Sequence, residues 1–297
     1  MGMKVSAGED WKTLPKWPPF RKFPEARGIY IDPELNLSQW LYRYVRAEQA
    51  FQMLDSRALW FAAPHTWDDP HEKWWCRLLF SKGSHLATAY AYGSCWTTRS
   101  HDEPFWRLYA CNCPSGETRQ NSNAVSTDES DLPAVRFRVR AGALRDWLLD
   151  ATANSVCKTF IGKVRYCSVR QLRSVASQYA ASNSNPSHHA ATALHLKRQA
   201  YEFESEVRML WIDRKPRSRG RAVPIDPACM FDQVMIGPSM KDARRRFASV
   251  KARLIEGGIP EAIITESSIG YVPRVVRRAG ALLLHGAQGK SADGAIQ

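Results

Sequence analysis

The alternation of apolar and charged side chains is clearest between Tyr201 and Trp211. With a period of two, the apolar residues fall on one face and the charged residues on the other: Phe203, Val207, Met209 and Trp211 against Glu202, Glu204, Glu206 and Arg208. This pattern predicts a half-buried strand, because a helix would scatter the apolar positions around its axis. Side chains two apart on one strand face are separated by roughly 6.5–7 Å.

The same patterns divide the rest of the chain into short strands and amphipathic helices. Strands are predicted over 41–45, 59–62, 90–98, 135–139, 164–166, 231–238 and 262–265. Helices are predicted near 47–54, 144–148, 171–181 and 239–254, with another that begins at Ser187. A turn is predicted over 66–72. The elements interleave without a strict βαβ rhythm, so we expect one α+β domain with a split, mostly antiparallel sheet and flanking helices.

Composition separates this domain from the two ends of the chain. Residues 1–36 are rich in proline and tryptophan and predict an extended N-terminal arm. The domain itself is expected over 37–272, and residues 273–297 predict a partly disordered tail. Residues 114–132 contain little to bury and predict a long mobile loop.

Charge and cysteine content limit the kinds of partner and ligand that we expect. The 297 residues carry 42 Lys and Arg against 29 Asp and Glu, which favours an anionic partner. No apolar run approaches the roughly 18 residues needed to span a bilayer, and the start lacks a signal-peptide core. We therefore expect a cytoplasmic protein without membrane contact, although export without a cleaved signal stays open. The seven scattered cysteines lack zinc-ligand spacing, so no metal is expected.

The charged residues of the 201–211 stretch also indicate a candidate catalytic pair of carboxylates. Glu204 and Glu206 would be neighbouring like charges, with Arg208 the next cation on that row. Adjacent carboxylates push their pKa values apart, an arrangement that enzymes use. A solvated strand face with an arginine–glutamate pair would show the same pattern, and both interpretations stay open.

Four motifs in a fixed order resemble one family. They are Tyr42-Arg43-Tyr44; Trp67-Asp68-Asp69-Pro70-His71-Glu72; Cys95-Trp96-Thr97 followed by Trp106 and Tyr109; and Lys197, Tyr201, Glu204, Glu206 and Arg208. Together they are similar to the bacterial domain-of-unknown-function family numbered twenty-nine seventy-one, across roughly residues 40 to 240. The chain departs from the family pattern at Asp68 (usually Asn), Thr97 (usually Ser) and Tyr201 (usually Trp). The family name implies no activity.

An early arginine, a middle Ser/Thr and a late Glu-x-Glu also resemble the plan of ADP-ribosyltransferases. This weaker resemblance implies that fold, with NAD as the substrate and a protein or nucleic acid as the acceptor of ADP-ribose. It implies that Arg43 contacts NAD, that Thr97 braces the binding strand and that Glu206 holds the nicotinamide ribose. Glu204 would face the acceptor. A toxin or defence setting follows only by analogy.

The remaining motif residues are candidates for supporting roles. Tyr44, Trp106 and Tyr109 could bind the cofactor. Trp96, Trp106 and Tyr109 could stack on nicotinamide or adenine, although such aromatic residues also fill cores. Supporting roles are predicted for Asp69, Glu72, Lys197 and Arg208. Arg43 could instead pair with Asp69 or Glu72, and the turn that holds both could be a structural cap.

Two rival functions remain from the sequence. A metal-dependent nuclease would place Mg²⁺ among Asp69, Glu204 and Glu206, with a basic surface along DNA or RNA. A non-catalytic module would bind nucleic acid or a protein partner through the basic loop over 214–221.

Overall fold

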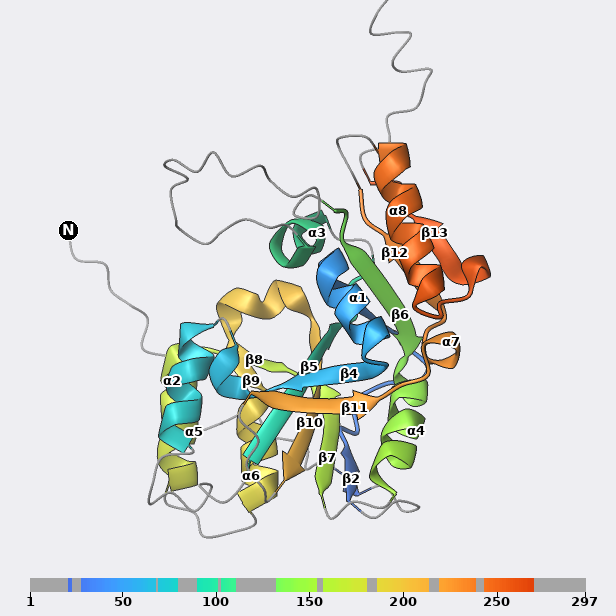
Figure 1. Ribbon diagram of the computed structural model, residues 1–297. Helices are drawn as coiled ribbons and strands as arrows, with labels where there is room; N and C mark the ends of the chain where they lie inside the picture. The colour runs from blue at the N-terminus through green and yellow to red at the C-terminus, as the bar shows by residue number, and fades with distance from the viewer. Residues whose placement is uncertain are drawn as a thin grey trace, which may run out of the picture.

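The computed structural model describes residues 21–22, 28–67, 69–79, 90–100, 103–110, 132–153, 157–180, 186–213, 219–238 and 243–269. Its largest element is an 11-stranded sheet that helices cover on both faces (Figure 1). The strands of this sheet are β1 (Arg21–Lys22), β2 (Ile29–Ile31), β3 (Trp40–Val45), β4 (Ala58–Ala62), β5 (Tyr90–Thr97), β6 (Val135–Arg140), β7 (Lys158–Lys163), β10 (Glu206–Asp213), β11 (Gly220–Pro224), β12 (Gln233–Ile236) and β13 (Ile264–Glu266). A second, two-stranded sheet pairs β8 (Arg165–Cys167) with β9 (Leu196–Arg198).

The helices complete the α+β architecture. They are α1 (Ala47–Asp55), α2 (Pro70–Leu79), α3 (Glu103–Ala110), α4 (Ala141–Thr152), α5 (Val169–Ala180), α6 (Pro186–Leu194), α7 (Pro227–Met230) and α8 (Ala243–Glu256), with 3₁₀ turns η1 (Pro64–Thr66), η4 (Gln199–Glu204) and η5 (Glu261–Ile263). Within the large sheet only the β2–β7 and β12–β13 pairs are parallel. The predicted α+β class with a mostly antiparallel sheet is therefore confirmed.

The large sheet forks at β5. One edge of β5 pairs with β10 at eight successive positions, from Glu206↔Thr97 to Asp213↔Tyr90. The other edge meets β3 only at Tyr42↔Thr97 and β4 only at Ala62↔Gly93. One branch continues through β3, β6, β12 and β13, and the other through β4 and β11. Residues 94–96 of β5 thus face a gap between the branches.

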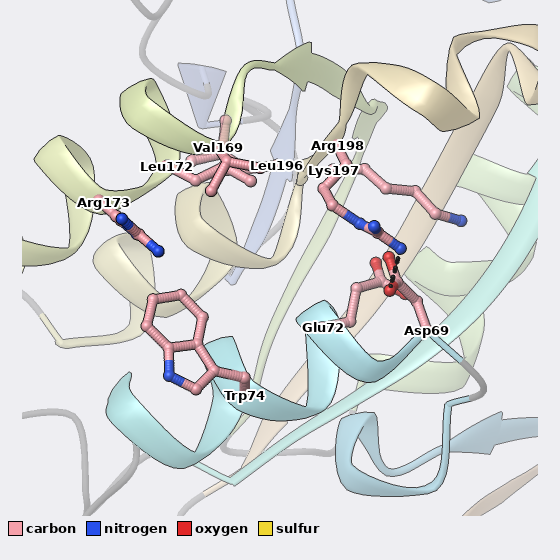
Figure 2. Close-up of a pocket in the computed structure, with 9 residues that line it drawn as sticks. All are labelled: Asp69, Glu72, Trp74, Val169, Leu172, Arg173, Leu196, Lys197 and Arg198. Atoms are coloured by element: carbon pink, nitrogen blue, oxygen red, sulfur yellow. Dashed lines mark hydrogen bonds and ion pairs between the residues drawn. The ribbon is translucent and has the colours of Figure 1, made fainter.

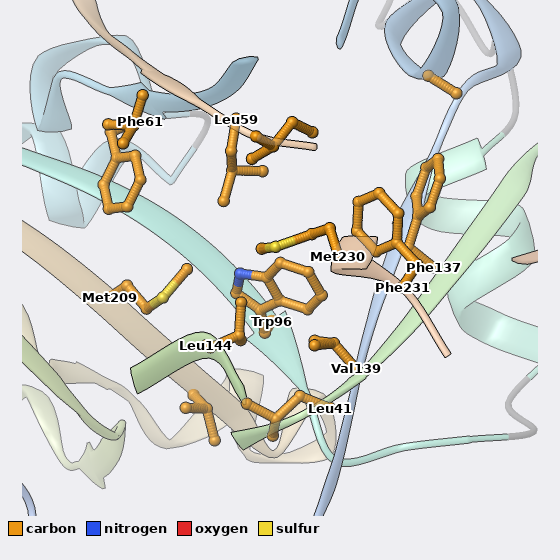
Figure 3. Close-up of a cluster of buried hydrophobic side chains, with 14 of the residues drawn as sticks. Leu41, Leu59, Phe61, Trp96, Phe137, Val139, Leu144, Met209, Met230 and Phe231 are labelled. Atoms are coloured by element: carbon orange, nitrogen blue, oxygen red, sulfur yellow. The ribbon is translucent and has the colours of Figure 1, made fainter. Parts of the chain in front are cut away.

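Two apolar clusters hold the sheet between its helices. The larger cluster, shown in part in Figure 3, packs α1, α4 and α8 against the sheet and includes Phe137, Met209 and Trp211. The smaller cluster packs α6 against the opposite face through Phe160 and Leu210. Because alternate residues of β10 enter different clusters, this strand is buried on both faces.

The strand predicted through 201–211 is wrong in its first half. Residues 199–204 form η4, and Ser205 adopts a left-handed backbone conformation with φ of 45° before β10 begins at Glu206. The half-buried pattern is also wrong, because α6 covers the face that carries Arg208. Ser205 therefore separates the two glutamates, which do not share one strand.

Of the other predicted elements, some are confirmed and some are wrong. The apolar spacing of α1 is confirmed by its buried residues Ala47, Ala50 and Leu54. The turn predicted over 66–72 is wrong, because α2 begins at Pro70, a residue suited to the first helical position. Strands β2, β7 and β11 have no counterpart in the prediction, and β2 lies within the segment expected as an arm. Residues 114–131 and 273–297 lie outside the described residues.

Among the described segments, none of the helices is long and apolar enough to cross a bilayer.

Replacement of Phe137 by alanine tests the larger cluster. Phe137 is fully buried against Phe231, so Phe137→Ala should lower the unfolding free energy by about 3–5 kcal/mol. The half-exposed Ile255 provides the control, and Ile255→Ala should change stability by less than about 0.5 kcal/mol. Urea unfolding followed by circular dichroism measures both, and equal losses would contradict the assignment of this core.

Candidate functional site

A cavity of about 730 Å³ occupies the fork of the sheet, and we call it the fork cavity. Strands β3, β4, β5 and β10 line it, together with η4 and Lys197 of β9. Most of the predicted site residues meet there: Arg43, Tyr44, Asp69, Glu72, Thr97, Lys197, Glu204, Glu206 and Arg208. Residues as distant in sequence as Arg43 and Glu206 thus share one hollow.

Trp106, a predicted stacking residue of α3, does not line the cavity. Trp106 is 4 % exposed and packs edge-on against Tyr44, with Met235 in the same cluster. It therefore fills a core, which the sequence had left as the alternative. Tyr109 lies in α3, but its side chain is outside the described part of the structure.

Five buried side chains of alternating charge form the floor of the fork cavity, and we call them the charge network: Glu204, Lys197, Glu206, Arg208 and Glu72. The Lys197 ammonium lies 2.6 Å from Glu204 Oε2 and 3.2 Å from Glu206 Oε2. The Arg208 guanidinium lies 2.8 Å from Glu206 Oε1 and 2.8 Å from Glu72 Oε1. The network therefore joins β9, η4, β10 and α2.

The charges of the network determine the ionisation of its members. Burial would raise the pKa of the Glu206 carboxyl, but Arg208 and Lys197 outweigh burial and hold that pKa well below its usual range. Burial would lower the pKa of Lys197, but Glu206 and Glu72 raise it instead. Glu206 is therefore an anion and Lys197 a cation throughout the physiological pH range.

Glu206 receives an unusually full set of donors. Its oxygens accept bonds from Nε and Nη2 of Arg208 and from Nζ of Lys197. A carboxylate offers about four lone-pair directions. Because most of those of Glu206 are already occupied, this residue would act on a ligand chiefly through its charge.

Arg43 is half-buried, whereas Lys197 and Arg208 of the same cavity are buried. The Nη1 atom of Arg43 donates to Ser94 Oγ over 2.5 Å, and its guanidinium lies 6.0 Å from the centre of the Trp96 ring. Burial lowers the pKa of this guanidinium, with only Cys95 opposing the shift. In the part of the chain that the structure describes, Arg43 forms no ion pair. The predicted pairing with Asp69 or Glu72 is therefore wrong.

Thr97 fixes the start of β10. Its backbone pairs with Glu206, and its hydroxyl donates to the carbonyl oxygen of Glu204 over 2.6 Å. The same hydroxyl accepts the amide of Arg99 over 3.0 Å. Thr97 thus holds both glutamates through the backbone, as a residue that braces the strand would do.

Asp69 and Glu72 lie on the boundary between the fork cavity and a smaller second cavity of about 340 Å³ (Figure 2). Asp69 pairs with Arg198 over 2.7 Å, and Figure 2 shows this pair beside Lys197. The apolar side chains of the second cavity come from α2, α5 and β9: Trp74, Val169, Leu172 and Leu196. Asp69 and Glu72 therefore lie in the wall between the two cavities, and each forms an ion pair with an arginine.

Several cavity residues were absent from the sequence prediction. Trp67 lies against Gly93, and the guanidinium of Arg208 lies 4.3 Å from the centre of its ring. Outside the cavity lining, the Tyr166 hydroxyl accepts the amide N–H of Glu206 over 2.8 Å. The alternation of Gly93, Cys95 and Thr97 on one face of β5 was a signal available in the sequence, because all three line the cavity.

No family model, no curated protein and no solved structure matches this chain. The resemblances that the motifs carry therefore stay predictions.

Removal of the cation at the centre of the network tests its energetics. Lys197→Met leaves Glu204 and Glu206 without their shared partner and should cost about 3–5 kcal/mol at pH 7. Lys251 in the exposed pair with Glu261 is the control, where the same change should cost less than about 1 kcal/mol.

The pH dependence of that loss has a definite sign. The lowered pKa of Glu206 contributes stability above about pH 4.3, its unfolded value, and that contribution fades as the pH falls below it. In Lys197→Met a proton taken up by either glutamate relieves the repulsion, so the loss should be smaller at pH 5 than at pH 7. Urea unfolding at both pH values measures it, and a loss independent of pH would contradict the network.

Proposed function

We propose that the protein binds NAD in the fork cavity and transfers its ADP-ribose to a protein or nucleic-acid acceptor. The observation that carries this proposal is Arg43, a half-buried guanidinium on the cavity wall without an ion pair among the described residues. A charge partly withdrawn from water is stabilised when an ion of opposite sign pairs with it. An anionic group of a ligand would supply the missing charge.

The charge network on the cavity floor is opposite in sign to Arg43. This supports a ligand that carries both a negative and a positive charge. The charge network contains three carboxylates and two cations, which leaves one net negative charge. NAD carries an anionic diphosphate and a cationic nicotinamide ring. The diphosphate would pair with Arg43, and the ring with its ribose would lie toward Glu206.

The network also suits the chemistry of nicotinamide release. Cleavage of the bond between nicotinamide and ribose develops positive charge on the ribose, and a fixed anion stabilises such charge without reorganisation. Glu206 would be that anion, since its partners keep it ionised. Glu204, two residues earlier on η4, would accept the proton of the incoming acceptor group.

A metal-dependent nuclease has less support. Asp69 pairs with Arg198, and Glu204 and Glu206 both pair with Lys197, so an entering Mg²⁺ would have to displace these cations. Among the described residues no group of three or more His, Cys, Asp or Glu side chains is placed to hold a metal ion.

A binding module without catalysis is the second candidate. The three hydrogen bonds that the Glu206 carboxylate accepts favour it, because a carboxylate so fully bonded makes few direct contacts with a ligand. This candidate keeps Arg43 as the anion contact and predicts ligand binding without nicotinamide release.

Replacement of Glu206 by glutamine separates the two candidates. Incubation with NAD labelled in nicotinamide should show release by the native protein, and Glu206→Gln should slow release by at least about 100-fold through loss of the anion. Glu261→Gln, at an exposed pair, is the control and should leave release unchanged. NAD binding without release by the native protein would contradict catalysis. Nicking of plasmid with Mg²⁺, lost in Glu206→Gln, would instead support the nuclease.

Replacement of Arg43 by methionine separates binding from stability. Arg43→Met should weaken NAD binding by about 10- to 100-fold, since a charge-assisted contact is lost. It should leave the unfolding free energy unchanged or higher, because a half-buried charge without an ion pair is removed. Calorimetric titration and urea unfolding measure the two effects.

The matched control is the same change at Arg208, which is 1 % exposed and pairs with two glutamates. Arg208→Met should cost about 3–5 kcal/mol of stability. A comparable loss of stability in Arg43→Met would show that Arg43 is structural.

A further inference from the structure

Exposed large apolar side chains gather at the two cavities. Six are exposed among the described residues: Trp60, Trp74, Leu108, Val169, Phe203 and Ile255. Trp60, Leu108 and Phe203 line the fork cavity, and Trp74 and Val169 line the second cavity. Only Ile255 lies away from both. Apolar surface concentrated at the mouth of a charged cavity indicates contact with a ligand.

Trp60 is the aromatic residue of the fork cavity with the most open surface. It is 46 % exposed, whereas Trp96 is 2 % exposed and Trp67 lies between Gly93 and Arg208. Phe203 contacts the rings of Phe105 and Tyr201. Among the described residues, Trp60 contacts no other aromatic ring and no cation.

Gly220 on the neighbouring strand leaves room for the indole of Trp60. Strand β11 pairs with β4 so that Gly220 lies opposite Ala62, diagonal to Trp60. A Cβ at position 220 would stand 2.5 Å from Cζ2 of Trp60, so any other residue there would displace the ring. The indole thus rests on backbone while nearly half of the residue stays exposed at the cavity.

The fork brings Trp60 and Arg43 to the same cavity. Strand β4 joins β5 at Ala62↔Gly93, and Trp60 lies two residues before that point on its branch. Arg43 reaches Ser94 from the other branch. Both side chains line the fork cavity, so one ligand held there can contact both. A nucleotide offers a flat base to the indole and a phosphate to the guanidinium.

We infer that Trp60 forms a stacking subsite for the planar base of a nucleotide whose phosphate pairs with Arg43. The inference rests on the proposed NAD site and specifies which side chain recognises its ring. Stacking of a base on an aromatic side chain is tolerant of the base's identity, so adenine and nicotinamide are both suitable occupants.

Two ligands that differ only in the base test the subsite. Calorimetric titration of AMP and of ribose 5-phosphate compares a nucleotide with its base-free counterpart. Trp60→Leu should weaken AMP binding by about 5- to 100-fold and leave ribose 5-phosphate binding unchanged. Trp60→Phe retains a ring and should lose less. Ile255→Ala, an exposed residue away from both cavities, is the control and should bind both ligands as the native protein does.

The outcomes separate the subsite from the transfer reaction. Binding of NAD that depends on Trp60, without nicotinamide release, supports the subsite and overturns the transfer. Nicotinamide release with an unchanged KM in Trp60→Leu overturns the subsite and leaves the transfer standing. Equal weakening of AMP and ribose 5-phosphate, no effect on either, or no AMP binding by the native protein would each overturn the subsite.

Discussion

The alternation of charge from Glu204 through Lys197, Glu206 and Arg208 to Glu72 is the interaction on which the rest of the site depends. Each buried ion is stable there because an ion of opposite sign lies within hydrogen-bond distance. The chain of pairs also ties α2 to the consecutive segments β9, η4 and β10, with Glu72 and Arg208 136 positions apart in sequence. The loss of one inner member would leave its neighbours as buried like charges, so the network is a structural element as much as a chemical one.

The fork in the sheet is the geometric counterpart of this network. Each branch touches β5 at a single position, Thr97 or Gly93, so a cavity opens between the branches with the charge network as its floor. Arg43 lies on the wall of this cavity and forms no ion pair with the described residues. A molecule that carries charges of both signs matches this arrangement.

The sequence predicts local elements well and long-range ones less well. The spacing of Ala47, Ala50 and Leu54 is a property of one helix, and α1 is where it was expected. The strand expected through 201–211 fails at Ser205, because a left-handed residue leaves no periodic signal and the partners of Glu204 and Glu206 come from β9. Burial of both faces of β10 depends on α6, which no pattern within the strand reveals.

For the candidate site, too, the sequence predicts some residues correctly and misses those whose place depends on distant parts of the chain. The order of motifs directs attention to Arg43, Thr97 and Glu206, and the structure brings all three to one cavity. Their roles toward NAD stay predictions. Trp106 belongs to a core, since an aromatic residue in a helix has the same sequence signature in either place. Trp60 was missed because its place in the cavity depends on Gly220, 160 positions further along the chain.

A crystal structure of the protein with ADP-ribose bound tests the central claim most directly. The account predicts the diphosphate within hydrogen-bond distance of the Arg43 guanidinium, the adenine against Trp60 and the terminal ribose toward Glu206, with the charge network unchanged. ADP-ribose bound outside the fork, or bound in it with Arg43 free of the diphosphate, would contradict the account.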